Sequence, residues 1–144
     1  MSRFRKLSHS LWHCQYHIIW VPKYRHRILT KHIGYEVDNC ITAFSEQKDV
    51  EILEMNILPD HIHLVTMIPP KVSISGYCGI IKGRTAIRVF NKYKDRKPKP
   101  YWGNLFWTEG YCVDTVDLDS EMIRKYVKYQ ENKAHKIEYQ GKLF

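Results

Sequence analysis

Two apolar-rich runs, residues 50–58 and 61–68, are separated only by Pro59-Asp60, and no other feature of the sequence constrains the fold as strongly. A connection this short joins antiparallel neighbours, because Pro and Asp both favour a tight turn. The sequence therefore predicts a β-hairpin in the middle of the chain. The segments before and after it have to pack against that hairpin.

Strand and helix patterns alternate on both sides of the predicted hairpin. Residues 12–21 are rich in aromatic and β-branched side chains and stop at Pro22, which predicts a strand. Apolar residues spaced three and four apart predict a helix over about 33–47. The same spacing predicts a second helix after Ser73, a candidate N-cap, although three glycines weaken its middle.

The last third of the chain adds one strand and one helix to this pattern. Residues 105–116 have strand composition, and an apolar stripe predicts a helix over about 120–136. The resulting order is β-α-β-β-α-β-α. It predicts an α+β fold, a ferredoxin-like (RRM-like) sandwich of an antiparallel sheet with helices on one face, plus an extra C-terminal helix.

Length and composition indicate one globular domain. The 144 residues suit a single hydrophobic core, so we expect one domain over 1–144. The four cysteines are scattered, with no C-x-x-C pair, which predicts reduced thiols rather than a zinc site or a disulfide framework. No apolar run approaches the roughly 18 residues of a membrane span, so we expect a cytoplasmic protein without a membrane partner.

Basic side chains are concentrated in two segments. Residues 1–31 and 82–100 each carry a net charge of +7, whereas 32–81 sums to −5 and 101–144 to −1. This segregation favours a surface that binds a polyanion, although two merely solvated surfaces would also explain it. Aromatic residues within the first segment and beside the second suit stacking on unpaired bases. The pattern favours binding of single-stranded nucleic acid.

The predicted strand 61–68 begins with His61-Ile62-His63. Side chains alternate between the faces of a strand, so the two imidazoles share one face and can bind one divalent cation. Asp60 immediately precedes them and can either ligate the metal or orient an imidazole. Taken alone, an H-x-H pattern is more often two half-exposed histidines than a metal site.

In the predicted last helix, Tyr126 and Gln130 lie four residues apart and therefore on one face, a single turn from each other. They can present a phenol beside an amide oxygen. The ordinary alternative is a core tyrosine and a solvated glutamine.

With these residues in view, the chain resembles the small TnpA transposases of the HUH superfamily, single-tyrosine enzymes of insertion sequences that move as single-stranded DNA. The resemblance covers nearly the whole chain and depends on an ordered set of motifs. They are Trp12-His13-Cys14-Gln15-Tyr16-His17-Ile18-Ile19-Trp20, Pro22-Lys23-Tyr24-Arg25, Pro59-Asp60-His61-Ile62-His63, Ile81-Lys82-Gly83-Arg84, Phe106-Trp107, Gly110-Tyr111 and Tyr126-Val127-Lys128-Tyr129-Gln130.

The resemblance implies that His61, His63 and Gln130 bind Mg²⁺ or Mn²⁺ and that Tyr126 is the nucleophile. A tyrosine that attacks phosphorus forms a 5′-phosphotyrosine, so the freed 3′-hydroxyl can later reverse the step on another strand. The family often has Asn where this chain has Tyr129, which makes Tyr129 a competing nucleophile. Its different helical face and the family register favour Tyr126.

The resemblance also implies a homodimer whose subunits share active sites, and recognition of hairpins in single-stranded DNA at the ends of the element. We therefore expect a DNA-associated protein of a prokaryotic cytoplasm. Trp102 and Trp107 are interpreted as core residues rather than stacking platforms. The predicted DNA-binding residues are Arg3, Arg5, Lys23, Arg25, Lys82, Arg84, Arg88 and Lys97.

Two alternatives stay open at this point. The same fold serves non-catalytic nucleic-acid-binding modules, and the same histidines suit a metal-dependent nuclease that uses water.

Overall fold

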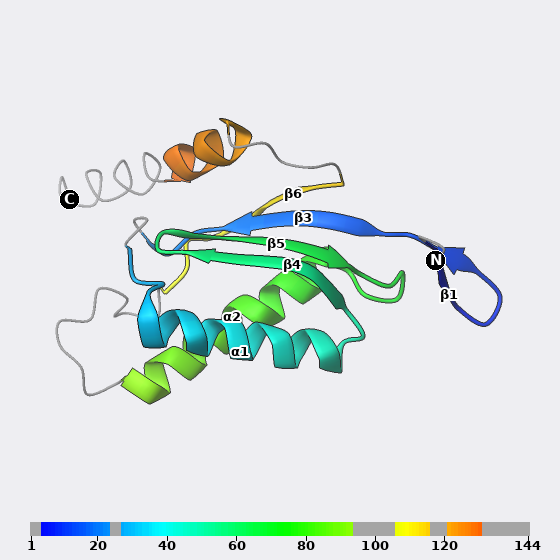
Figure 1. The fold of residues 1–144 in the computed structure, drawn as a ribbon, viewed down its shortest axis with the longest axis horizontal. Helices are drawn as coiled ribbons and strands as arrows, with labels where there is room; N and C mark the ends of the chain where they lie inside the picture. Colours follow the sequence, from blue (N-terminus) through cyan, green and yellow to red (C-terminus); the bar gives the residue numbers. More distant parts are fainter. Residues whose placement is uncertain (1–3, 24–26, 94–105, 116–120, 131–144) are drawn as a thin grey trace, which may run out of the picture.

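A computed structural model of the chain describes residues 4–23, 27–93, 106–115 and 121–130. An antiparallel sheet is covered on one face by two helices and on the other by helix 121–130 (Figure 1). A small two-stranded ribbon, β1 (Arg5–Lys6) and β2 (Leu11–Trp12), projects at one end. No helix in these ranges is both long and apolar enough to cross a membrane.

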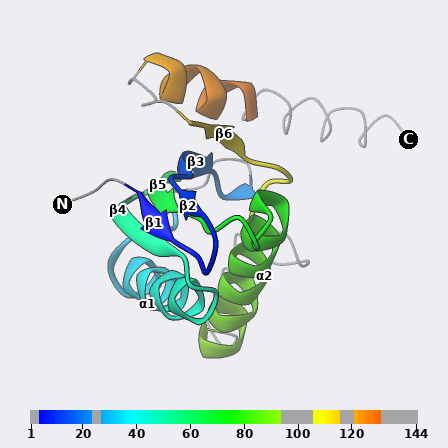
Figure 2. The ribbon, with the colours of Figure 1, turned by 90° about the vertical axis from the view of Figure 1, so that its right-hand side faces the viewer.

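The main sheet has the strand order β4-β5-β3-β6, and every neighbouring pair is antiparallel. Its strands are β3 (Gln15–Trp20), β4 (Glu51–Leu58), β5 (His61–Met67) and β6 (Cys112–Asp114). The helices α1 (Lys31–Gln47) and α2 (Ile74–Tyr93) lie side by side on one face (Figure 2). The β-α-β-β-α-β element order and the α+β class predicted from the sequence are therefore confirmed.

The central hairpin is confirmed residue by residue. Leu58 pairs with His61, so Pro59 and Asp60 form a two-residue connection between β4 and β5. The amide of Leu29 donates to the Pro59 carbonyl oxygen (3.1 Å), which ties this turn to the segment that leads into α1.

Two strand predictions were wrong in extent. The expected strand 12–21 is interrupted after Trp12, so that β2 belongs to the ribbon and β3 begins only at Gln15. The expected strand 105–116 shrinks to β6, with a separate bridge between Pro22 and Trp107. Gly110 lies between them with a φ of 85°, a left-handed conformation that breaks an extended strand.

Helix α2 runs unbroken through its three glycines. Ser73 is its N-cap as predicted, because the Gly76 amide donates to the Ser73 hydroxyl oxygen (3.0 Å). A Cβ at Gly76 would lie 2.7 Å from that oxygen, so glycine lets the cap approach closely. The low helix propensity of the three glycines is thus outweighed by the N-cap and by packing against the sheet.

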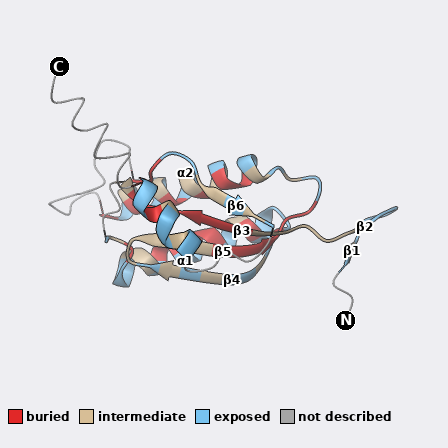
Figure 3. Ribbon diagram, turned by 90° about the horizontal axis from the view of Figure 1, so that it is seen from above, coloured by how far each residue is buried: buried red, intermediate tan, exposed pale blue. Residues whose placement is uncertain are grey.

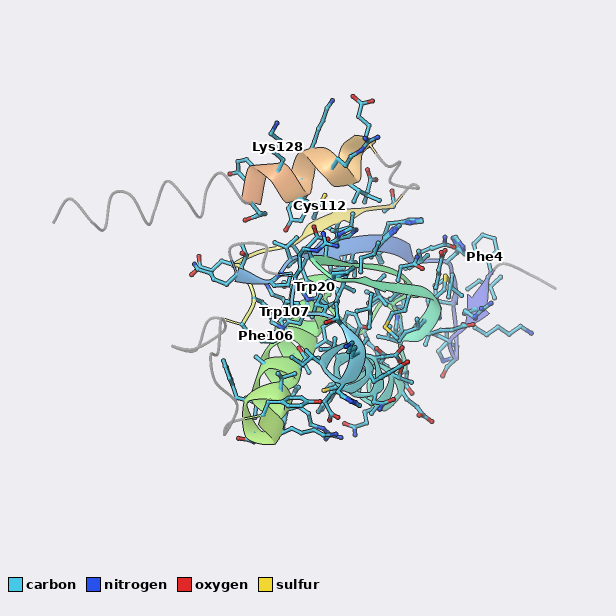
Figure 4. All side chains as sticks on the ribbon, turned by 60° about the vertical axis from the view of Figure 1, so that its left-hand side comes forward. Phe4, Trp20, Phe106, Trp107, Cys112 and Lys128 are labelled. Carbon is cyan, nitrogen blue, oxygen red and sulfur yellow. The ribbon has the colours of Figure 1, made fainter. Side chains whose placement is uncertain are left out.

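The main core lies between the sheet and the two helices. Ile18, Trp20, Ile62 and Leu64 are fully buried there, and we call this side of the sheet the helix-covered face. Trp107 packs edge-on against Trp20 and donates from its indole nitrogen to the Lys82 carbonyl oxygen (3.0 Å). Trp107 is a core residue, as predicted, while Trp102 lies outside the described residues (Figure 4).

Helix 121–130 lies on the opposite face of the sheet, above β3 and β6 (Figures 1 and 2). Within this helix, Val127 and Gln130 are buried, whereas Tyr129 is exposed. The burial colours show β3 and β5 enclosed at the centre and the β1-β2 ribbon exposed (Figure 3). The remainder of the predicted helix, 131–136, lies outside the described residues.

Candidate active site

His61 and His63 point to the side of the sheet opposite α1 and α2. Their register partners on β4 are Leu58 and Asn56, and Ile19 of β3 lies opposite His63. Directly opposite residues of an antiparallel pair project to the same side. We call this side the histidine face. The alternation expected from the sequence is therefore confirmed.

Asp60 orients the first of these histidines. Its Oδ1 lies 2.9 Å from His61 Nδ1, and both side chains are only 16% exposed. When the proton is on Nδ1, that nitrogen donates to the carboxylate and Nε2 is left with a lone pair for a metal ion. Of the two roles that the sequence allowed for Asp60, the geometry favours orientation of His61.

A third histidine lies beside His63. His17 of β3 is 7% exposed, and its ring centroid is 5.8 Å from that of His63, with the planes tilted by 37°. Asp114 of β6 is directly opposite His17 and therefore on the same face. His17 belongs to a motif that carried the family resemblance, but its place on this face was missed. The alternation along 12–21 was the signal that would have found it.

Two cavities flank His61 beneath helix 121–130. The larger, of about 580 Å³, lies between β4, the two histidines and the helix residues Ile123 and Arg124. The smaller, of about 350 Å³, lies beside Asp60 and is lined by Ile123, Arg124 and the next turn of the helix. Arg124 lines both cavities, and the sequence analysis had not singled it out.

Tyr126 is on the same helix but not in these cavities. Neither Tyr126 nor Gln130 is among their lining residues, and Tyr126 lies toward Cys112 of β6, which is beneath the helix (Figure 4). Within the described part of the chain, Tyr126 Oη and Gln130 Oε1 are buried and make no hydrogen bond of good geometry, although the Gln130 amide is close enough to the phenol to affect its pKa. The chain thus brings the two histidines together and places the tyrosine and the glutamine on the other flank of the helix.

Burial sets the electrostatics of the tyrosine. It raises the pKa of the Tyr126 phenol well above its ordinary value of 10.0, because a phenolate would lose its hydration there. The neighbouring Cys112 also raises this pKa, and the Gln130 amide lowers it in part. The phenol is neutral in this packing. Tyr129, the competing tyrosine, is 60% exposed on the outer side of the helix.

The metal donors available to this site are limited. Among the described residues, no group of three His, Cys, Asp or Glu side chains could hold a metal ion. His61 and His63 would therefore need a donor of another kind, such as an amide oxygen. Gln130 Oε1 is a buried amide oxygen without a hydrogen-bond partner in the described chain, so its chemistry fits that need, although it does not line the histidine cavities.

The predicted DNA-binding residues already have partners within the chain where the structure describes them. Arg5 donates to Glu51 (2.8 Å) and Arg88 to Glu36 (2.8 Å). Lys82 donates to the carbonyl oxygens of Thr108 (2.9 Å) and Gly110 (2.7 Å).

Burial lowers the pKa of the Lys82 ammonium group, as expected for a cation that supports the loop before β6. Arg84 lies over the Phe44 ring, with Cζ 5.1 Å from the ring centroid. Lys23 hydrogen-bonds through its backbone to the Phe106 carbonyl (2.9 Å). Arg3, Arg25 and Lys97 lie outside the described residues.

Comparisons with known proteins identify the class. Residues 10–130 match the family described as "Transposase IS200 like". The IS200 transposase of Salmonella typhimurium is 37% identical over 90% of this chain and 85% of its own length. The ISDra2 transposase TnpA of Deinococcus radiodurans is 33% identical over 83% of this chain and 85% of its own.

Comparison with solved structures also finds transposases. A protein of Deinococcus radiodurans R1 assigned as a transposase is 28% identical, with a TM-score of 0.78 over 88% of this chain and 97% of that one. A REP-associated tyrosine transposase bound to a REP hairpin has a TM-score of 0.53 at 17% identity, which is a likeness of fold alone.

The protein is thus a transposase, an enzyme of DNA cleavage and joining. It belongs to the IS200-like transposases of the HUH superfamily.

Proposed function

We propose that this transposase cleaves and rejoins hairpin-bearing single-stranded DNA at insertion-sequence ends, through a 5′-phosphotyrosine on Tyr126. The reaction would take place on a ferredoxin-like core whose C-terminal helix carries the nucleophile. One observation supports the proposal above the others. His61 and His63 share a face, Asp60 orients the first of them, and the helix that bears Tyr126 lies directly above.

In this proposal His61 Nε2, a ring nitrogen of His63 and Gln130 Oε1 hold Mg²⁺ or Mn²⁺. Such an ion supplies Lewis-acid stabilisation of the charge that develops on the scissile phosphate. Two nitrogens and one amide oxygen are an unusual set for Mg²⁺, so Mn²⁺ is the better probe. Asp60 keeps the His61 ring in the tautomer that leaves Nε2 available.

The chemical step is a transesterification. The Tyr126 oxygen forms a bond to phosphorus while the bond to the 3′ oxygen breaks, and the phenol proton is balanced by the proton gained by the 3′-hydroxyl. The reverse step on a second strand joins DNA without an external energy source. Because Tyr126 lies outside the cavities that the histidines line, it has to leave the packing described above to react beside His61 and His63 of its own chain.

The proposed homodimer offers one route. If helix 121–130 of one subunit serves the histidines of its partner, Tyr126 and Gln130 meet His61 and His63 across subunits. This proposal is supported by the position of Tyr126 on the flank away from the histidine cavities of its own chain.

Hairpin DNA is the proposed substrate because a neighbour of the same fold is described in complex with a REP hairpin. The basic residues would contact the backbone phosphates. Arg5, Lys82 and Arg88 are the weakest members of the predicted set, since their charged groups already bind carbonyl or carboxylate oxygens.

A labelled hairpin-bearing single strand from the element's own end, incubated with Mn²⁺, tests the proposal. We expect a covalent protein–DNA adduct that is lost in Tyr126→Phe and in His63→Ala and is kept in Tyr129→Phe. Cleavage that persists in Tyr126→Phe would indicate a nuclease that uses water. Binding without cleavage would indicate a non-catalytic module. Loss of the adduct in Tyr129→Phe alone would transfer the nucleophile to Tyr129.

A further inference from the structure

The pair His17 and His63 is not explained by the histidine motif itself. His17 comes from β3, a different strand, and its side chain is enclosed on the histidine face at 7% exposure. Histidine is intermediate in its tendency to be buried, and enclosing its polar nitrogens costs free energy unless they are partnered. The burial of His17 on this face therefore needs an explanation from the residues around it.

One contact of the His17 ring is with the imidazole of His63. A separation of 5.8 Å between ring centroids at a tilt of 37° puts the two rings against each other. The strand register makes this contact reproducible. His17 is opposite Val65 and Ile19 is opposite His63, so the two histidines are diagonal neighbours on adjacent strands.

The two motif histidines are thus supported differently. His61 lies beside the turn and is held through Nδ1 by Asp60. His63 comes two residues further along β5, and its ring lies against the ring of His17. Asp114 lies opposite His17 and completes a polar row across three strands, from β6 through β3 to β5.

We propose that His17 is a positioning residue for His63. Its ring limits the orientations that the His63 ring can adopt and so presets His63 for a divalent cation. The inference rests on the metal site of the proposed function. It predicts that His17 affects metal affinity through His63, not as a ligand in its own right.

Titration of the full-length protein with Mn²⁺ alone tests this role without requiring activity. Loss of groups that orient a metal ligand commonly lowers affinity about 10- to 100-fold. We expect a loss of that size in His17→Ala. His17→Phe restores a flat ring and should recover most of it. His32→Ala, an exposed histidine on α1, should bind Mn²⁺ like the wild type.

A double-mutant cycle separates positioning from general damage to the fold. If His17 acts through His63, adding His17→Ala to His63→Ala should not weaken residual Mn²⁺ binding further. Thermal unfolding of each variant checks that the fold persists.

Two results would overturn the inference. One is wild-type Mn²⁺ affinity in His17→Ala while His63→Ala loses binding. The other is an equal loss in His17→Phe and His17→Ala, because a ring of similar shape would then not suffice. Failure of the wild-type protein to bind Mn²⁺ would instead overturn the metal site of the proposed function, and the inference with it.

Discussion

On the helix-covered face, Ile18, Trp20, Ile62 and Leu64 are fully buried and apolar. On the histidine face, the alternate residues of the same two strands include His17, His61 and His63. Two buried tyrosine hydroxyls also differ. Tyr77, between the helices and the sheet, shares a 2.5 Å hydrogen bond with Ser45, whereas Tyr126 Oη makes no hydrogen bond of good geometry in the described chain. Thr66 Oγ1, on the helix-covered face, is likewise buried without a partner there.

The difference shows that the two faces of one sheet have separate roles. The helix-covered face forms the apolar core, and the histidine face carries the candidate active-site residues. Burial of apolar side chains on the helix-covered face stabilises the fold. Buried polar atoms without partners are rare in native proteins, and they often mark a site that binds something else. Gln130 Oε1 and Tyr126 Oη, which make no hydrogen bond of good geometry in the described chain, belong to the helix that lies over the histidine face.

The largest expected effect comes from adjacent residues of β5 that project to opposite faces. Leu64→Ala should lower the free energy of unfolding by about 2–5 kcal/mol, because it leaves a cavity in the core. His63→Ala should lower it by about 1 kcal/mol or less, yet strongly weaken Mn²⁺ binding. Chemical denaturation together with Mn²⁺ titration measures both. Similar losses of stability in the two variants would contradict the division between faces.

A middle-sized effect is expected at Glu36, which accepts hydrogen bonds from Arg88 (2.8 Å) and Lys92 (2.7 Å). These bonds, first of all that with Lys92, lower the pKa of the Glu36 carboxyl below its ordinary value of 4.5. The ion pairs therefore stabilise the fold at pH values above 4.5, where the Glu36 carboxylate is charged in both the folded and the unfolded chain. This contribution is lost as the pH falls through the lower pKa that Glu36 has in the folded protein.

Because Arg88 and Lys92 are more than half exposed, solvent screens these pairs and their contribution is small. Glu36→Gln should be slightly less stable than the wild type near neutral pH. The difference should vanish in acid. A denaturation series across pH measures it, and a constant difference at every pH would show that charge is not the cause.

The smallest effect, and the one whose sign matters, is expected at Tyr126, for which Tyr77 is the comparison. Tyr126→Phe removes a buried hydroxyl that makes no hydrogen bond of good geometry and has the Gln130 amide as a neighbour, so its melting temperature should change little. Tyr77→Phe removes a bonded hydroxyl and leaves Ser45 Oγ buried, so it should lose about 1–2 kcal/mol. If Tyr126→Phe were the more destabilising change, its hydroxyl would have a partner after all.

Sequence patterns were sufficient for the main elements because each element has its own periodicity. Alternation in 61–68 placed His61 and His63 on one face, and three- and four-residue spacing predicted both helices that cover the sheet. Ser73 was recognisable as a cap from its position before the apolar stripe. These are local signals.

The remaining features depend on contacts between distant segments. The end of β2 and the shortness of β6 follow from the ribbon and from the loop held by Lys82, neither of which has a local signature. A helical stripe shows that Tyr126 and Gln130 face the protein, but not which flank of the sheet lies beneath them. Hence the separation of Tyr126 from the histidine cavities could not be predicted.

The irregularity in β4 bears on the edge of the candidate site. Its pairing with β5 shifts between Ile52 and Glu54, so Leu53 is an extra residue. Side chains on a strand follow odd and even positions, and one added residue reverses that parity. Before the shift the even-numbered Ile52 packs toward the helices, and after it the odd-numbered Met55 and Ile57 do so. The extra residue Leu53 therefore exchanges the two sides of the edge strand β4. As a result the apolar residues after it still face the helices, and Asn56 lies beside His63 on the histidine face.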